Sequence, residues 1–194
     1  MMSTQREAPP LEITWHTARG VVLFADIDGF FPMAGKMKIN ELCSFTQSLY
    51  SLWGGEIRRQ RGEVVMHVGD SVIGLFSSEG CGGADPEWCA TLAAFHICKA
   101  VKKQHPELDV NIAINLGEIA DGRWQEQGRS MRTLLGETVN RAAQMLNGKQ
   151  KGIFVTRPVA DVLGPRVKTE KFTLRLPSDT AQEEGIYRLV SLVL

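Results

Sequence analysis

The sequence predicts an α+β domain in which helices cover a sheet, and three observations support this prediction. Residues 21–25 form an unbroken apolar run with β-branched members, which is typical of a strand covered on both faces. Residues 62–76 contain two apolar runs separated by Gly69-Asp70, as a tight β-hairpin requires. Apolar residues recur at helical spacing after Asn40, and strands and helices do not alternate strictly along the chain.

Length and composition predict one domain. The chain has 194 residues, of which 43% are hydrophobic, and this is enough for one substantial core. We expect a flexible N-terminal arm over residues 1–16, which contain Pro9-Pro10 and little periodicity, and a single domain over residues 17–194. No basic-then-apolar leader or long apolar span is present, which predicts a cytoplasmic protein without membrane insertion. Lys plus Arg (22) equal Asp plus Glu (22), which argues against nucleic-acid binding.

The four cysteines indicate reduced thiols. Paired C-x-x-C spacing is typical of zinc sites and of redox centres. The cysteines show no such spacing and therefore favour neither zinc nor disulfides. They are Cys43, Cys81, Cys89 and Cys98.

The other elements are predicted from apolar spacing and from turn residues. Asn40 is a good N-cap for the first long helix. Gly117 and Gly122 predict a bend or a hairpin after the strand that precedes them. Helices are expected at residues 31–38 (short or irregular), 40–59, 85–105, 137–146 and 158–163, and strands at residues 110–116, 133–135, 153–156, 167–174 and 186–192.

A carboxylate, Asp26, lies where the first predicted strand ends. A carboxylate followed by a glycine, here Gly29, suits a hard cation that carries phosphates, because glycine lets the backbone approach a ligand closely. The amides from Ile27 to Phe30 would then cradle phosphate oxygens. An ordinary turn explains this stretch equally well when it is considered alone.

The hairpin supplies a second carboxylate. If the hairpin pairs with the first strand, Asp70 in its turn comes next to Asp26. Two carboxylates at one sheet edge favour a divalent metal site. Asp28 is a candidate third acid, although a solvent-facing turn carboxylate is the simpler interpretation of that residue.

Four motifs then occur in an order that resembles the class III nucleotide cyclase catalytic domain. They are Phe24-x-Asp26-Ile27-x-Gly29-Phe30, then Gly69-Asp70, then Gly117 and Gly122, and finally Gly136-Glu137-Thr138-Val139-Asn140-x-Ala142-Ala143. The resemblance spans about residues 20–156. It implies a sheet covered by helices, a head-to-tail homodimer with active sites between the protomers, and conversion of a nucleoside triphosphate into a 3′,5′-cyclic monophosphate and pyrophosphate.

The resemblance also implies roles for single residues. Asp26 and Asp70 would hold two Mg²⁺ or Mn²⁺ ions, with the carbonyl of Ile27 as a further ligand. One ion would lower the pKa of the ribose 3′-hydroxyl, and the other would bind the triphosphate and neutralise the leaving pyrophosphate. The substrate would contact the turn formed by Ile27, Asp28, Gly29 and Phe30.

The catalytic helix departs from the family pattern. Asn140 would come from the partner protomer and orient the ribose. The transition-state arginine is expected four residues later, where this chain has Gln144. Arg141 is the nearest catalytic candidate in sequence, but it points a quarter turn or more away from that helix face. Arg129 or Arg132 could supply the charge from the preceding loop and strand.

The base-contacting positions depart as well. Met66 replaces the expected lysine or glutamate, and Thr133 replaces the expected aspartate or cysteine. A thioether cannot hydrogen-bond a purine edge usefully. The pocket therefore reads a different base or none, and we expect a different base because both carboxylates and Asn140 are retained. Tyr50 is a candidate to fill the room left by a smaller ring, although an amphipathic packing role explains it as well.

With these departures the chain resembles the short bacterial pyrimidine cyclases of anti-phage signalling. That resemblance implies UTP as the favoured substrate and cyclic UMP as a second messenger, with cyclic CMP as the other pyrimidine product. It also implies a separate effector protein that responds to the cyclic nucleotide.

Other functions stay open. A purine (adenylate) cyclase would belong to the same family but use a different base. A non-catalytic cyclase-like signalling module would agree with Gln144, which cannot supply the charge of the family's arginine. Haloacid-dehalogenase phosphatases share the Asp26-x-Asp28 opening but require a Thr or Val where Phe30 stands and a later acid where Gly74 stands. Diguanylate cyclases share the opening too, but the hairpin lacks their second glycine and the glutamate that follows it.

Overall fold

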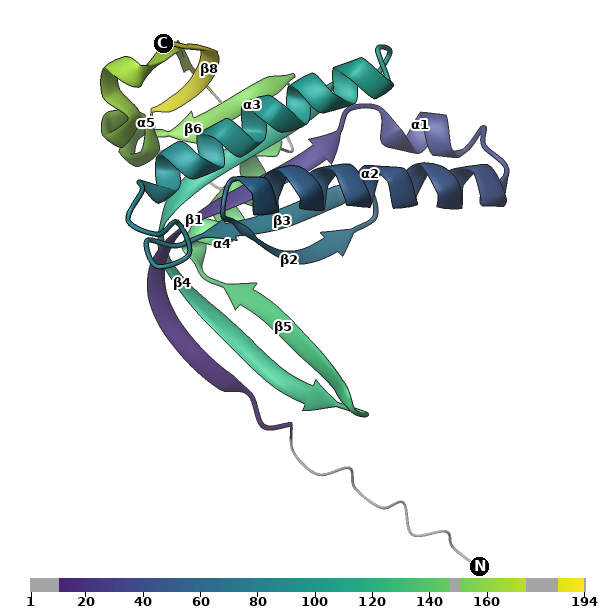
Figure 1. Ribbon diagram of the computed structural model, residues 1–194, viewed down its shortest axis with the longest axis horizontal. Coiled ribbons are helices and arrows are strands. Elements are labelled where there is room, and N and C mark those ends of the chain that lie inside the picture. The colour runs from purple at the N-terminus through teal and green to yellow at the C-terminus, as the bar shows by residue number, and fades with distance from the viewer. Residues whose placement is uncertain (1–10, 147–150, 174–184, 194) are drawn as a thin grey trace, which may run out of the picture.

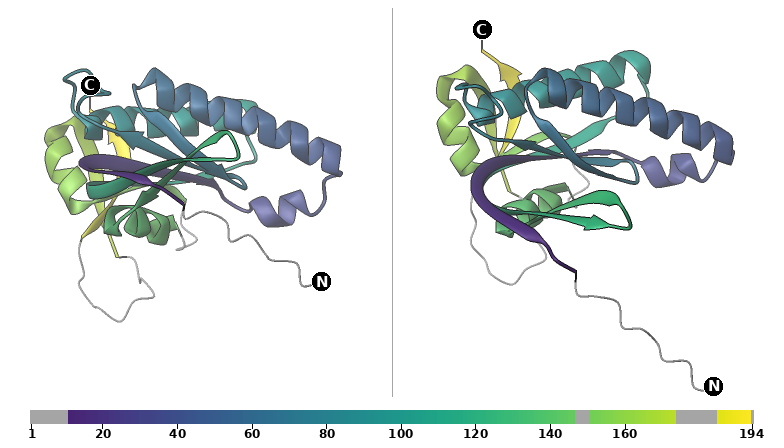
Figure 2. Two further views of the ribbon diagram at one scale, coloured as in Figure 1. Left: turned by 90° about the horizontal axis from the view of Figure 1, so that it is seen from below. Right: turned by 60° about the horizontal axis from the view of Figure 1, so that its bottom comes forward.

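A computed structural model describes residues 11–146, 151–173 and 185–193, and it shows an eight-stranded mixed sheet with helices on both faces (Figures 1 and 2). The strand order is β2-β3-β1-β4-β6-β8-β7, and β5 pairs with β4 outside this path. The strands are β1 (Thr14–Ile27), β2 (Glu63–Val68), β3 (Ser71–Phe76), β4 (Val110–Glu126), β5 (Arg129–Leu135), β6 (Gly152–Thr156), β7 (Val167–Phe172) and β8 (Ile186–Leu192). The helices are α1 (Phe30–Ala34), α2 (Ile39–Arg59), α3 (Pro86–Gln104), α4 (Glu137–Leu146), α5 (Arg157–Leu163) and a 3₁₀ turn, η1 (Gly164–Arg166). This arrangement confirms the predicted α+β class.

The core is divided by the sheet into two apolar layers. Alternate residues of β1 enter opposite layers, because successive side chains of a strand point to opposite faces. Leu23 packs in the layer under α2, α3 and α5, whereas Val22 packs in the layer under α4. Both residues are fully buried, so β1 is covered on both faces as its apolar run predicted.

The two long strands β1 and β4 extend beyond this core. They pair antiparallel from Thr14 opposite Arg123 to Ile27 opposite Val110, and with β5 they form a projecting arm (Figure 1). The expected domain boundary at Thr17 therefore falls inside β1, whose first three residues already belong to the sheet.

Of the bend or hairpin predicted at Gly117 and Gly122, the hairpin is wrong, whereas β4 does curve where the arm leaves the rest of the sheet (Figure 1). β4 runs continuously through both glycines, and the chain reverses only between Glu126 and Arg129. The glycines serve close packing instead. A Cβ on Gly122 would lie 2.6 Å from the Trp15 ring, and a Cβ on Gly117 would collide with the hydroxyl of Thr138.

The remaining predictions mostly agree with the structure. The hairpin, α4 and β8 have the predicted positions, while Leu174, the predicted end of β7, lies outside the described residues. Asn40 is not the N-cap of α2, because the helix begins at Ile39 and the side chain of Glu41 accepts a hydrogen bond from the amide of Lys38. The four cysteines are free thiols, and none of the described helices is long and apolar enough to cross a membrane.

Candidate metal centre

Asp26 and Asp70 meet at one edge of the sheet. Asp26 is the penultimate residue of β1, and Asp70 lies in the two-residue turn between β2 and β3. The pairing of β1 with β3 brings Ser71 next to Asp26, and the Ser71 hydroxyl donates a 2.8 Å hydrogen bond to Asp26 Oδ1. The amide of Ile27 donates a 3.3 Å hydrogen bond to Asp70 Oδ2. Sequence reasoning predicted the two aspartates but missed Ser71, which follows Asp70 directly.

The pKa of Asp70 is unusually high for an aspartate. Burial raises the pKa of Asp70 to about 7, and the hydrogen bond with Asp26 and the negative charge of Asp26 act in the same direction. The backbone amides of Asp70 and Ile27 offset only part of this rise. Near pH 7 Asp70 is therefore partly protonated, and its carboxyl group shares a hydrogen bond with Asp26.

A divalent cation fits this arrangement. A cation between the carboxylates would replace the proton that Asp70 otherwise retains, and carboxylate oxygens are the ligands that Mg²⁺ and Mn²⁺ prefer. The described residues contain no group of three or more His, Cys, Asp or Glu side chains that could hold a metal ion. The other ligands would therefore be backbone oxygens, water or substrate phosphates, and the Ile27 carbonyl stays a prediction as one of them.

The turn after β1 offers fewer amides than predicted. The amide of Ile27 is directed to Asp70, and the amide of Asp28 donates a 2.9 Å hydrogen bond to the carbonyl of Asp109. The amides of Gly29 and Phe30, at the start of α1, are the two that remain for phosphate oxygens. Gly29 has a φ of +74°, which favours glycine, and a Cβ there would meet open space.

Asp28 has a different partner from Asp26. Its carboxylate lies 3.3 Å from Lys151 Nζ, which also contacts Asp109 at 2.7 Å. An ordinary exposed ion pair of this kind agrees with the interpretation of Asp28 as a solvent-facing turn carboxylate. Lys151 was not predicted, because it is distant in sequence and only the fold brings it to this turn.

Tyr50 and Met66 lie on opposite faces of the sheet. Met66 packs in the apolar layer shared with α4. Tyr50 belongs to α2, and its ring stacks on His67 with 4.0 Å between the ring centroids and 15° between the ring planes. The structure therefore does not group Tyr50 with Met66, and a role for either residue beside a base stays a prediction.

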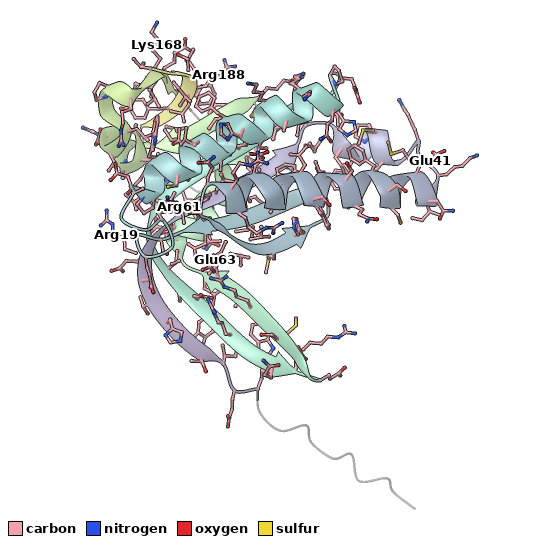
Figure 3. All side chains as sticks on the ribbon, in the orientation of Figure 1. Arg19, Glu41, Arg61, Glu63, Lys168 and Arg188 are labelled. Carbon is pink, nitrogen blue, oxygen red and sulfur yellow. The ribbon has the colours of Figure 1, made fainter. Side chains whose placement is uncertain are left out.

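Arg132, the neighbour of Thr133 on β5, belongs to a charged network. Thr133 is half-buried and lies opposite Gly122 of β4. Arg132 donates hydrogen bonds of 2.9 Å to both carboxylate oxygens of Asp121. It also donates a 2.7 Å hydrogen bond to Glu63 of β2, which is labelled in Figure 3. Arg132 is therefore committed to a structural network, which sequence reasoning missed because its members are far apart in the chain.

The two catalytic candidates, Asn140 and Arg141, both lie on α4. Asn140 is exposed on α4, which packs against β1 and β4. Arg141 lines a cavity of about 600 Å³ next to Glu118 and Thr138, and its Nε atom is shielded from solvent.

Comparison with known protein families decides the family. The profile of the adenylate and guanylate cyclase catalytic domain matches residues 16–183, which is most of the chain. The chain belongs to this cyclase family. The predicted resemblance to class III nucleotide cyclases is confirmed at this level, and the two rival enzyme families considered from sequence are not needed to explain the motifs.

Individual cyclases show the same relationship. An adenylate cyclase from Anabaena cylindrica is 28% identical over 192 residues, which cover 91% of this chain and 36% of the relative. A photoactivated adenylate cyclase subunit alpha from Euglena gracilis is 24% identical over 161 residues, which cover 76% of this chain and 15% of the relative. The chain thus spans 36% of the length of the Anabaena relative and 15% of the length of the Euglena relative.

Solved cyclase structures share the fold. The adenylyl cyclase CyaB from P. aeruginosa superposes with a TM-score of 0.83 at 17% identity, over 93% of this chain and 97% of CyaB. The guanylate cyclase domain of RhGC from Catenaria anguillulae, solved with GTP, gives a TM-score of 0.79 at 17% identity, over 92% of this chain and all (100%) of that domain. These cyclases are named for purine substrates, so the resemblance to pyrimidine cyclases stays a prediction.

Proposed function

We propose that this chain is a metal-dependent nucleotidyl cyclase that converts a nucleoside triphosphate into a 3′,5′-cyclic monophosphate and pyrophosphate. The contact between Asp26 and Asp70 is the observation that supports this proposal most strongly. A pair of carboxylates held together at a sheet edge, with the pKa of Asp70 raised to about 7, is arranged for a cation rather than for folding stability. Membership of the cyclase family agrees with this chemistry.

Each residue of the site would have a separate role. Asp26 and Asp70 would hold Mg²⁺ or Mn²⁺, and Ser71 would keep the Asp26 carboxylate in its orientation. The bound ions would supply charge stabilisation for the triphosphate and would ease deprotonation of the ribose 3′-hydroxyl. The amides of Gly29 and Phe30 would bind phosphate oxygens.

A homodimer would complete the site. Asn140 is exposed on α4, so it is available to orient a ribose bound by a partner protomer. A head-to-tail pair would place one such residue in each of two sites. Among the similar solved structures, the guanylyl cyclase domain of RhoGC from Blastocladiella emersonii is described as a non-canonical dimer.

We favour UTP as the substrate and cyclic UMP as a second messenger for a separate effector protein. Met66 offers an apolar thioether and Thr133 a single hydroxyl, and neither provides the paired hydrogen bonds that a purine edge requires. The transition-state charge that Gln144 cannot supply would then come from another residue. Arg141, on the same helix, is the candidate.

ATP is the second candidate substrate. The adenylate cyclase of Anabaena cylindrica is 28% identical over 91% of this chain, and it is named for a purine product. The Thr133 hydroxyl could contact an adenine edge on its own.

One experiment decides among these functions. Purified protein is incubated with ATP, GTP, CTP and UTP in turn with Mn²⁺, and the products are identified by mass spectrometry. Cyclic UMP that disappears in Asp70→Asn supports the cyclase and its base together, whereas cyclic AMP would keep the cyclase and refute the pyrimidine assignment. The absence of any cyclic product and of pyrophosphate would contradict the cyclase and favour a non-catalytic signalling module.

A further inference from the structure

Tyr50 reaches from α2 to the turn that carries Asp70. Its hydroxyl donates a 2.6 Å hydrogen bond to the carbonyl oxygen of Gly69. Gly69 and Asp70 are the two residues of the β2–β3 turn, because Val68 pairs with Ser71. The bonded carbonyl therefore belongs to the central peptide of the turn, the same planar unit that contains the amide nitrogen of Asp70.

The central peptide of such a turn is its least constrained part. Turn types differ chiefly in the rotation of this peptide, and the ladder hydrogen bonds of the two strands do not fix it. Gly69 has a φ of +60°, which glycine adopts without strain. Because glycine has no Cβ, it does not restrict the rotation of the peptide that follows it. A hydrogen bond from a helix is therefore an effective way to hold the Asp70 backbone in one orientation.

We propose that Tyr50 is a positioning residue that fixes the Gly69–Asp70 peptide and so holds the Asp70 carboxylate against Asp26. This inference rests on the proposed function, because it assigns Tyr50 to the metal-binding turn of that site. It differs from a base-contacting role, since the Tyr50 hydroxyl already has an acceptor and lies on the opposite face from Met66.

His67 holds the Tyr50 ring from the strand below it. The two rings are nearly parallel at 15°, and His67 Nδ1 is buried without a hydrogen-bond partner among the described residues. Burial lowers the pKa of His67, and the charge of Arg58 lowers it further, so the ring is a neutral aromatic surface at pH 7. Stacking and hydrogen bonding then define the ring plane and the hydroxyl direction together.

The test compares Tyr50→Phe with Tyr187→Phe. Tyr50→Phe keeps the stacked ring and removes only the hydroxyl. Tyr187 is the only other tyrosine of the sequence, and it lies on β8, far along the sheet order from β2 and β3. Two readouts do not need catalysis: amide hydrogen exchange of the peptide that covers the β2–β3 turn, and Mn²⁺ affinity measured by electron paramagnetic resonance of free Mn²⁺.

We expect Tyr50→Phe to accelerate exchange in the turn and to weaken Mn²⁺ binding about threefold to tenfold, the range that the loss of one hydrogen bond predicts. Tyr187→Phe should change neither quantity. With the four nucleoside triphosphates, turnover by Tyr50→Phe should fall by the same factor for each accepted substrate, with the loss in kcat at limiting Mn²⁺ and partial recovery at high Mn²⁺.

Two results would overturn the inference. Unchanged turn exchange together with unchanged Mn²⁺ affinity would leave Tyr50 as a packing residue, and a changed preference among the four bases would make it a base contact. Failure of the proposed function has a separate signature, because wild-type protein would then form no cyclic product. The exchange measurement would still report whether Tyr50 fixes the turn.

A second pair of variants examines the stacking partner. His67→Phe retains an aromatic face under Tyr50 and should keep the wild-type Mn²⁺ affinity, whereas His67→Ala removes this face and should weaken binding in the same direction as Tyr50→Phe. Equal affinities for the two His67 variants would contradict the proposed role of the stacked rings.

Discussion

Asp70 and Asp121 belong to the same sheet and are equally shielded from solvent, at 7% and 8% exposure, yet their surroundings are opposite. The neighbour of Asp70 is another carboxylate, Asp26, which together with burial raises its pKa. Burial also opposes the ionisation of Asp121, but hydrogen bonds from Arg132 and then Arg123 outweigh it and lower the pKa of that group.

The two aspartates differ in whether the fold supplies a counter-ion for the buried carboxylate. At Asp121 the chain supplies its own counter-ions, so that the network joins β4, β5 and β2 without a ligand. At Asp70 the described residues supply hydrogen bonds and a like charge, and we propose that a bound cation compensates it. Burial alone would not distinguish the two sites, whereas the sign of the pKa shift does.

The largest expected effect is on activity at the uncompensated site. Asp70→Asn should lower cyclase turnover at least about a thousandfold, because it removes a metal ligand worth several kcal/mol of transition-state stabilisation. Without metal, the folded protein should be as stable as wild type or more stable, since the substitution removes a repulsive charge. Pyrophosphate release and thermal unfolding measure the two effects, and a strongly destabilised Asp70→Asn would show that this carboxylate is structural.

The next effect concerns stability at the compensated site. Asp121→Ala leaves Arg132 without its main partner and should reduce the free energy of unfolding by about 2–3 kcal/mol. Urea unfolding monitored by circular dichroism measures this loss. Unchanged stability of Asp121→Ala would contradict the claim that the Asp121 ion pair stabilises the fold.

The pH dependence of stability sharpens the same contrast. Because the pKa of Asp121 is lower in the folded than in the unfolded state, this carboxylate contributes stability above the ordinary pKa of aspartate, and the contribution is lost as the pH falls through the lowered value. Asp121→Asn should therefore flatten the acid side of a stability curve measured between pH 2 and 6, roughly the window of that protonation. An acid limb as steep as that of wild type would contradict the assigned ion pair.

The smallest effect is expected at Lys151. Its side chain is 60% exposed, and its ion pairs with Asp28 and Asp109 are screened by water. Lys151→Ala should therefore leave the urea midpoint within experimental error of wild type at 0.15 M salt, roughly physiological ionic strength. A clear loss of stability would show that the turn after β1 depends on this lysine.

Much of the fold was predictable because its signals are local. The apolar run of β1, the Gly69-Asp70 turn and the helical spacing of α4 each lie within a few residues of one another, and the structure confirms all three. The hairpin alternative at Gly117 and Gly122 was wrong, because a glycine that makes room for a neighbour looks the same in a sequence as a glycine that makes a turn.

The candidate site was predictable only in part. Asp26 and Asp70 follow from strand ends and hairpin pairing, whereas the hydrogen bond from Tyr50 to Gly69 depends on how α2 packs against β2. Arg132 was a candidate for the missing catalytic charge, but its fork is engaged by Asp121 and Glu63 from two other strands. Such contacts between distant segments have no short-range signature in the sequence.

The most direct measurement is anomalous X-ray diffraction from crystals of the protein soaked in Mn²⁺. A manganese peak between the Asp26 and Asp70 carboxylates, absent from matched crystals of Asp70→Asn, is the predicted result. Saturating Mn²⁺ with no peak at this edge of the sheet, or a peak that persists in Asp70→Asn, would contradict the claim that the uncompensated pair is a metal site.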